Sequence, residues 1–152
     1  MGKGLRRDYA KAMQWLRKAS AAGNVIAMNG IATMYENGEG VPRNYGKTML
    51  WLRRAAARGS ATAMVDIGDL YTGGMGVPRD CARAIGWYKM AAARGNGFEN
   101  TLAMEKIGDL YSSGFDGVPK SYRRAEMWYR RAASAGDAAA RKSLAKLKAE
   151  GH

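Results

Sequence analysis

The chain has 152 residues, 47% of them hydrophobic and 25% charged, which is the composition of one soluble globular domain. It has one cysteine and one histidine, which excludes a Cys–His zinc site, a Cys–His catalytic dyad and a disulfide framework within a monomer. Its 25 Lys and Arg against 13 Asp and Glu give a net charge of +12, so acidic partners must be considered.

Two further segment types are also excluded. No run approaches the roughly 18 consecutive apolar residues of a membrane span, and no signal-peptide core follows the start. This and the single cysteine favour a cytoplasmic location, although the compartment itself is not determined by these features.

The chain is a repeat. Its four tryptophans stand 36, 36 and 41 residues apart, and four glycines keep the same intervals. The three prolines all end a Gly-Val-Pro tripeptide, at 40–42, 76–78 and 117–119. Self-similarity at this period is typical of a solenoid, in which one unit cannot bury its apolar face alone. The tryptophans are Trp15, Trp51, Trp87 and Trp128, and the glycines are Gly23, Gly59, Gly95 and Gly136.

The apolar spacing within each unit predicts two helices. Met64, Ile67 and Tyr71 recur at helical intervals, as do Ala84 and Tyr88 in the second half of the same unit. We call the two kinds first-type and second-type helices. The chain is predicted to begin with a second-type helix at about 8–22, followed by three pairs at 24–37 and 44–58, 60–73 and 80–94, and 96–114 and 121–135, and to end with a first-type helix at about 137–149.

These elements divide one repeat domain, residues 1–152, into five parts. The predicted divisions are a leading half repeat at 1–23, repeats at 24–59 and 60–95, a longer repeat at 96–136 and a capping helix at 137–152. The basic terminal helix is the kind of cap that a solenoid needs for solubility. The leading half repeat has no first-type helix, and this has two explanations. Either the chain is a fragment of a longer array, or it is complete and has an open N-terminal edge.

The turns explain where the helices stop and start. Glycine permits positive φ at the end of each first-type helix, and proline blocks its continuation. Asn44, Asp80 and Ser121 follow two residues after each proline, where a helix needs an N-cap acceptor. Gly4-Leu5-Arg6 keeps the same register one period earlier, so Asp8 is predicted to cap the leading helix.

These residues resemble the Sel-1-like repeat, a relative of the tetratricopeptide repeat. The matching positions in one unit are Ala63, Ile67, Gly68 and Tyr71, the turn Gly74, Gly76 and Val77, then Asp80, Ala84, Trp87, Ala91 and Ala92. The resemblance covers the chain from Gly4 to about Lys148. It implies an all-α, right-handed superhelix of stacked helix pairs, about eight helices here, that acts as a protein-binding scaffold.

The aromatic and sulfur-containing residues have structural interpretations. The Trp and Tyr positions are predicted to be core, because they recur at the packing spacing. Cys81 occupies a position held elsewhere by tyrosine, which predicts a semi-buried structural thiol.

The third repeat is longer than the others. Four extra residues precede Ala103 and one more precedes Gly117, and the two phenylalanines, Phe98 and Phe115, lie in these enlarged segments. Four residues are about one helical turn. The favoured interpretation is that each phenylalanine packs locally under a longer loop. The alternative is a binding hot spot, because exposed aromatics anchor partners.

Charge is divided by helix type. The first-type helices carry six acidic residues against Lys106 alone, whereas the second-type helices carry fourteen basic residues against three acidic ones. The resemblance places first-type helices on the concave wall, so a mildly acidic groove and a strongly basic back are expected. The predicted partner-binding residues of the groove are Asn29, Thr33, Glu36, Val65, Asp69, Thr72, Leu102, Glu105, Asp109 and Phe98.

The sequence therefore favours a non-catalytic scaffold that binds a protein or peptide in the concave groove. The expected partner is a basic or apolar segment. The alternative is a binder of nucleic acid or anionic surfaces through the basic convex face, and the charge division disfavours nucleic acid as the groove's ligand. No catalytic residue, cofactor or metal site is predicted. The expected state is a monomer, or a weak oligomer through the N-terminal edge.

Overall fold

The computed structural model describes residues 2–94 and 97–151, with side chains described from residue 8 onward. Over these ranges the chain forms eight helices and no strand. The helices are α1 (Gly2–Ala21), α2 (Val25–Asn37), α3 (Tyr45–Ala57), α4 (Ala61–Gly73), α5 (Cys81–Ala92), α6 (Phe98–Ser113), α7 (Tyr122–Ser134) and α8 (Ala138–Ala149).

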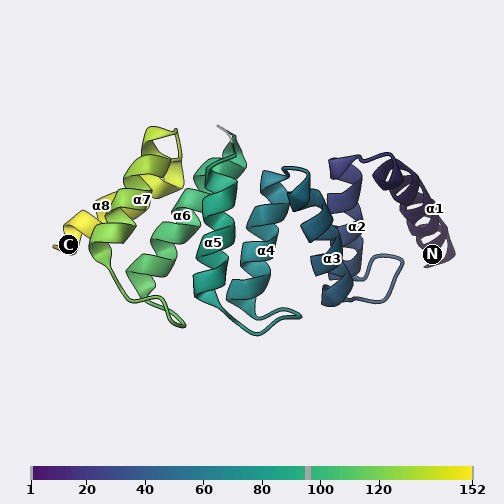
Figure 1. The fold of residues 1–152 in the computed structure, drawn as a ribbon, viewed down its shortest axis with the longest axis horizontal. Coiled ribbons are helices and arrows are strands. Elements are labelled where there is room, and N and C mark those ends of the chain that lie inside the picture. Colours follow the sequence, from purple (N-terminus) through teal and green to yellow (C-terminus); the bar gives the residue numbers. More distant parts are fainter. Residues whose placement is uncertain (1, 95–96, 152) are drawn as a thin grey trace.

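The helices stand side by side in one row, with the two chain ends at opposite ends of the row (Figure 1). Each helix packs on the one before it and the one after it. Ile31, Leu52, Ile67 and Ile107 are fully buried between them. The all-α helical repeat predicted from the 36-residue period is confirmed. Within the described ranges, no helix has the length and apolar character needed to cross a membrane.

The predicted turns are present. Gly38, Gly74 and Gly114 take left-handed backbone conformations and end α2, α4 and α6. Side-chain acceptors then cap the next helices: Asn44 accepts from the Lys47 N–H at 2.9 Å, and the side chains of Asp80 and Ser121 do the same one and two units on. The glycine-to-cap segment thus stops one helix and starts the next within a few residues.

The leading helix differs from its prediction. It begins at Gly2 rather than near residue 8, so Asp8 lies inside α1 and is not its N-cap. The physical reason is that Arg6 stands where the later units have proline. Arginine keeps its backbone N–H and fits a helix interior, whereas proline would have ended the helix.

The extra residues of the third repeat lengthen its first helix. α6 has 16 residues, whereas α2 and α4 each have 13. Phe98 is the first residue of α6 and its side chain is 72% exposed, so the local packing favoured for it is wrong. Phe115 is also exposed, with the guanidinium of Arg79 5.3 Å from its ring centre. Gly95, predicted to end a second-type helix, lies outside the described residues.

The aromatic positions are buried to different extents. Tyr35, Tyr71 and Tyr111 are buried, as predicted. Trp128 is 8% exposed, but Trp15 is 70% exposed, so the core assignment is wrong for that residue. Trp51 packs on residues of the preceding helices α1 and α2. No described helix precedes α1 to cover Trp15 in the same way.

Cys81 is more deeply placed than predicted. It is fully buried in the main hydrophobic cluster, whereas Tyr9, Tyr45 and Tyr122 at the equivalent positions are half-buried. A tyrosine ring there reaches outward, and the shorter cysteine side chain does not. The prediction of a structural thiol therefore holds in a stronger form.

Candidate functional site

The even-numbered helices α2, α4, α6 and α8 form one wall, which we call the inner wall. α4 packs directly on α6, although they belong to different repeats, and none of the second-type helices approaches the next one as closely. Around α4 and α6, side chains that point out from the even-numbered helices therefore lie on the more closely spaced side of the stack.

A three-residue arrangement builds the centre of this wall. The ring of Tyr88 on α5 lies over Gly68 on α4, so closely that a Cβ at Gly68 would overlap it. This approach lets the Tyr88 hydroxyl donate a 2.5 Å hydrogen bond to Oδ1 of Asp69. Burial, and then that hydrogen bond and the Asp69 charge, raise the pKa of Tyr88. The phenol therefore stays protonated and holds the carboxylate in place.

The same arrangement recurs one repeat later. Tyr129 lies over Gly108 and donates a 2.7 Å hydrogen bond to Oδ1 of Asp109. In the first repeat the equivalent residues are Ala32, Leu52 and Thr33. Glycine, tyrosine and aspartate thus occur together in two repeats. In the repeat that has alanine in place of the glycine, leucine replaces the tyrosine and threonine replaces the aspartate. The steric reason is that only glycine leaves room for the ring.

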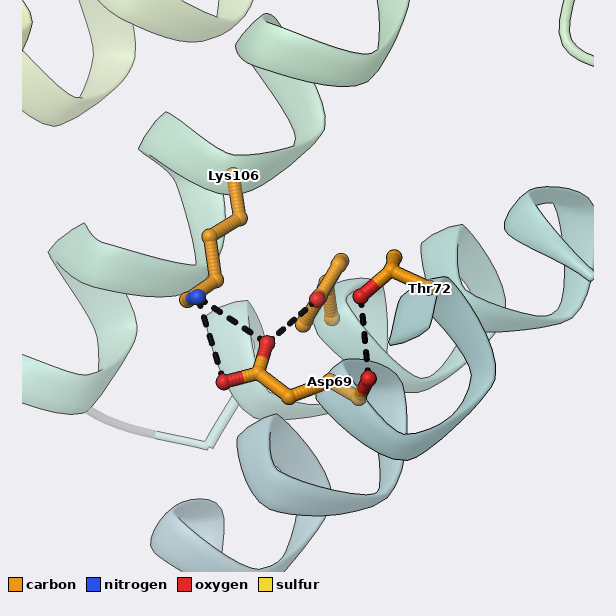
Figure 2. A network of polar contacts seen from close by, with 4 residues as sticks. Asp69, Thr72 and Lys106 are labelled. Carbon is orange, nitrogen blue, oxygen red and sulfur yellow. Dashed lines mark hydrogen bonds and ion pairs between the residues drawn. The ribbon is translucent and has the colours of Figure 1, made fainter. Parts of the chain in front are cut away.

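Lys106 on α6 connects two repeats across the wall. Its Nζ lies 2.9 Å from Oδ1 and 3.2 Å from Oδ2 of Asp69 on α4. Figure 2 shows the ammonium group reaching over to the carboxylate, with the Thr72 hydroxyl directed to the main-chain oxygen of Asp69. Because both charged side chains are partly exposed, this ion pair contributes modestly to stability. Its clearer effect is to neutralise part of the acidic wall.

The carboxyl groups around Asp69 carry excess negative potential. Burial, followed by repulsion from Asp69 and Glu36, raises the pKa of Asp66 to about 6, although Lys106 opposes the shift. The pKa of Glu36 is raised by burial and by Asp69. Since α2, α4 and α6 contain one cation, Lys106, the three carboxyl groups share a single neutralising charge.

A second acidic area lies between α6 and α8. Burial, and then the charges of Asp137 and Asp109, raise the pKa of Glu105. Beside it is a pocket of about 350 Å³, whose lining includes Asp109, Tyr129 and Lys146. At the position of Lys106 the next repeat has Ser143, so Asp109 lacks the bridging lysine that Asp69 has.

The structure distributes the predicted groove residues unevenly. Val65 is only 4% exposed and belongs to the core, so it offers no binding surface; this corrects its assignment to the groove. Leu102 is half-buried against the same cluster. The amide nitrogen of Asn29 donates to Ser60 Oγ at 3.0 Å. The other predicted residues lie half-buried or exposed on the even-numbered helices, namely Thr33, Glu36, Asp69, Thr72, Phe98, Glu105 and Asp109.

Sequence reasoning missed two members of the wall. The sequence shows Asp66 only as one of six acidic residues and Tyr88 only as a position of the helical pattern. In the structure the pKa of Asp66 is raised to about 6, and Tyr88 fixes Asp69. The signal that could have found Tyr88 is its joint occurrence with Gly68 and Asp69 in two of three repeats.

Comparison with known proteins agrees with this architecture. The family model described as Sel1 repeat matches residues 1–24, 25–60, 61–96 and 101–137. The chain belongs to the Sel1 repeat family. Sel1 repeat proteins generally mediate protein–protein interaction, and the family is a generally non-enzymatic scaffold family. None of the curated proteins compared with the chain matches it.

Solved Sel1 repeat structures resemble the chain closely. A Sel1 repeat protein from Oxalobacter formigenes is 34% identical with a TM-score of 0.83, over 93% of this chain and 56% of that one. A protective antigen of uropathogenic Escherichia coli with an SLR fold is 28% identical with a TM-score of 0.79, over 93% of this chain and 29% of that one. The chain thus spans little more than half of one relative and under a third of the other.

A third structure shows the likeness of fold alone. Helicobacter pylori cysteine rich protein B is 22% identical with a TM-score of 0.68, over 95% of this chain and all of that one. Its name refers to cysteine, and this Sel1 repeat chain has only Cys81.

Proposed function

We propose that this Sel1 repeat chain is a non-catalytic scaffold whose inner wall binds a protein or peptide segment that carries Lys or Arg beside apolar side chains. The observation that carries the proposal is the imbalance of charge on that wall. After burial, the charge of Asp69 raises the pKa of both Glu36 and Asp66, and Lys106 is the cation that opposes the shift at Asp66. A cationic side chain of a partner would relieve that repulsion.

Apolar anchors are available at the edges of the same wall. Phe98 is exposed at the start of α6, and Ile26 is exposed on α2. Exposed aromatic and aliphatic side chains beside charged groups are typical of binding hot spots. Acidic residues with exposed apolar residues at the edges of the same wall therefore support an extended or helical partner with mixed basic and apolar character.

The experiment compares charge reversal on the two sides of the stack. A labelled peptide that alternates lysine with leucine is titrated with the full chain, with Glu105→Lys plus Asp109→Lys, and with Glu126→Lys as the control on α7. The inner-wall variant is expected to weaken binding roughly tenfold at low salt, with a smaller effect at higher salt because exposed charges are screened.

Because Asp109 accepts a hydrogen bond from Tyr129, the variant Glu105→Lys plus Asp109→Asn is measured beside it, since asparagine retains that acceptor. Equal affinity for all variants at low salt would contradict the proposal, as would a stronger effect of Glu126→Lys.

The alternative function is the binding of nucleic acid or anionic surfaces through the basic second-type helices. α7 carries Arg123, Arg124, Arg130 and Arg131, of which Arg130 pairs with Glu126. A gel-shift titration with duplex DNA over a range of salt tests this alternative. A steep salt dependence, lost on replacement of Arg123 and Arg124 by Gln, would favour it over the inner-wall proposal.

A further inference from the structure

A cleft of about 830 Å³ opens on the opposite side of the stack, between the second-type helices α1 and α3. We call it the outer cleft. Its floor includes Met28 of α2, and its sides carry Trp51 and the exposed Leu50 of α3. The complete lining is Arg17, Ser20, Ala21, Met28, Tyr35, Lys47, Leu50, Trp51, Arg54, Ala57 and Arg58.

The charged side chains of the outer cleft all have the same sign. Arg17, Lys47, Arg54 and Arg58 line it, and no carboxylate does. The ion pairs found in the described part of the chain involve none of these four. Four cations around one concave surface concentrate positive potential there, because low-dielectric walls focus the field.

Contacts with Tyr35 and Trp51 hold three of these cations at the cleft. Lys47 Nζ lies 5.0 Å from the ring centre of Tyr35, and the Arg54 guanidinium lies 4.8 Å from that of Trp51. Arg17 donates a 3.5 Å hydrogen bond to the Tyr35 hydroxyl. These contacts restrict the long side chains before any ligand arrives, which lowers the entropy cost of binding.

The next repeat lacks part of this charge, although α7 again has arginines, Arg124 and Arg131, at the positions of Lys47 and Arg54. At the position of Lys47 the next repeat has Arg83, which forms a 3.1 Å ion pair with Asp80. The first repeat has Asn44 instead of that aspartate, so Lys47 has no such partner. At the position of Arg54 the next repeat has Met90, which removes a cation altogether.

We propose that the outer cleft binds an acidic peptide segment with an apolar anchor. Carboxylates of the peptide would pair with Arg17, Lys47 and Arg54, while an aliphatic or aromatic side chain would cover the exposed Leu50. The volume suits a few residues of such a segment. The chain would then have two binding surfaces of opposite charge on opposite sides of the stack, and this second site does not depend on the inner-wall proposal.

The geometry favours a peptide over single-stranded nucleic acid. Sequence-independent binding of single strands relies on open aromatic faces for base stacking. Here Arg54 lies against Trp51, which also packs on the core, and Tyr35 is buried under Lys47. A bare phosphate chain would in turn leave the exposed Leu50 uncovered.

The test uses the full chain and a matched pair of substitutions. Arg54→Met introduces the residue found one repeat later, and Arg131→Met makes the same change at the equivalent position of α7, where the guanidinium lies 4.9 Å from the ring centre of Trp128. Fluorescence anisotropy measures binding of a labelled peptide that alternates glutamate with leucine. The same peptide with glutamine for glutamate is the ligand control.

We expect Arg54→Met to weaken binding of the glutamate peptide roughly five- to tenfold and Arg131→Met to change it less than about twofold. Lys47→Gln should act in the same direction as Arg54→Met. Equal losses in the two methionine variants, or equal binding of the glutamine peptide, would overturn the proposal. So would an oligo-dT strand that binds more tightly than the peptide and is lost with Arg54→Met.

Discussion

The hydroxyl of Tyr88 reaches Oδ1 of Asp69 at 2.5 Å because its ring crosses the helix α4 at Gly68. A residue without a side chain therefore positions a charged one on the inner wall. Gly108, Tyr129 and Asp109 repeat the relationship one unit later.

Gly68→Ala should destabilise the chain by about 1–3 kcal/mol, because the added methyl group overlaps the Tyr88 ring. Gly86→Ala is the matched control: nothing lies near its Cβ position, so better helix propensity should stabilise by about 0.5–1 kcal/mol. Urea unfolding followed by circular dichroism measures both.

The double variant Gly68→Ala plus Tyr88→Leu copies the Ala32 and Leu52 pair of the first repeat. It should lose less stability than the two single variants together, because leucine removes the overlap. Strict additivity, or stabilisation by Gly68→Ala alone, would show that the ring does not constrain this position.

Asp66 should make stability depend on pH. Its pKa is raised from an ordinary 3.8 to about 6, so the folded state binds a proton more readily than the unfolded state. The charged form therefore destabilises the fold above pH 6, and stability attributable to this group is regained as pH falls from about 7 to 4.

Asp66→Asn should accordingly be more stable than the parent by about 1–2 kcal/mol at pH 7.5, after allowance for solvent screening. The difference should shrink toward pH 4. Thermal melts of both proteins across this range measure it. A constant difference between pH 4 and 8 would mean that Asp66 titrates normally.

The four equivalent tryptophans should differ in energetic importance. Trp128→Ala is expected to cost about 3–5 kcal/mol because the side chain is nearly buried. Trp51→Ala and Trp87→Ala, at half-buried sites, should cost about 1.5–3 kcal/mol, and Trp15→Ala less than about 0.5 kcal/mol. Denaturant titrations of the four variants test the order, and a loss at Trp15 as large as at Trp128 would contradict it.

The sequence by itself determined the helical repeat and its boundaries. Helix stops and starts are local events: Gly38 and Gly74 need positive φ, and Asn44 and Asp80 accept hydrogen bonds from an N–H three residues away. Such signals are readable without knowing what packs on what. The start of α1 was misplaced for an equally local reason. Arg6 keeps the backbone N–H that proline lacks, so it does not interrupt the helix.

The tertiary structure decided how equivalent positions differ. Trp15 and Trp128 share one place in the repeat, yet neighbouring helices cover only the second. Val65 had the spacing of a groove residue but lies in the core. Lys106 is a lone cation in the sequence and becomes the partner of Asp69, 37 residues away, only when α6 lies beside α4. Burial and charge pairing depend on contacts between repeats, and a pattern of spacing within one repeat carries no information about them.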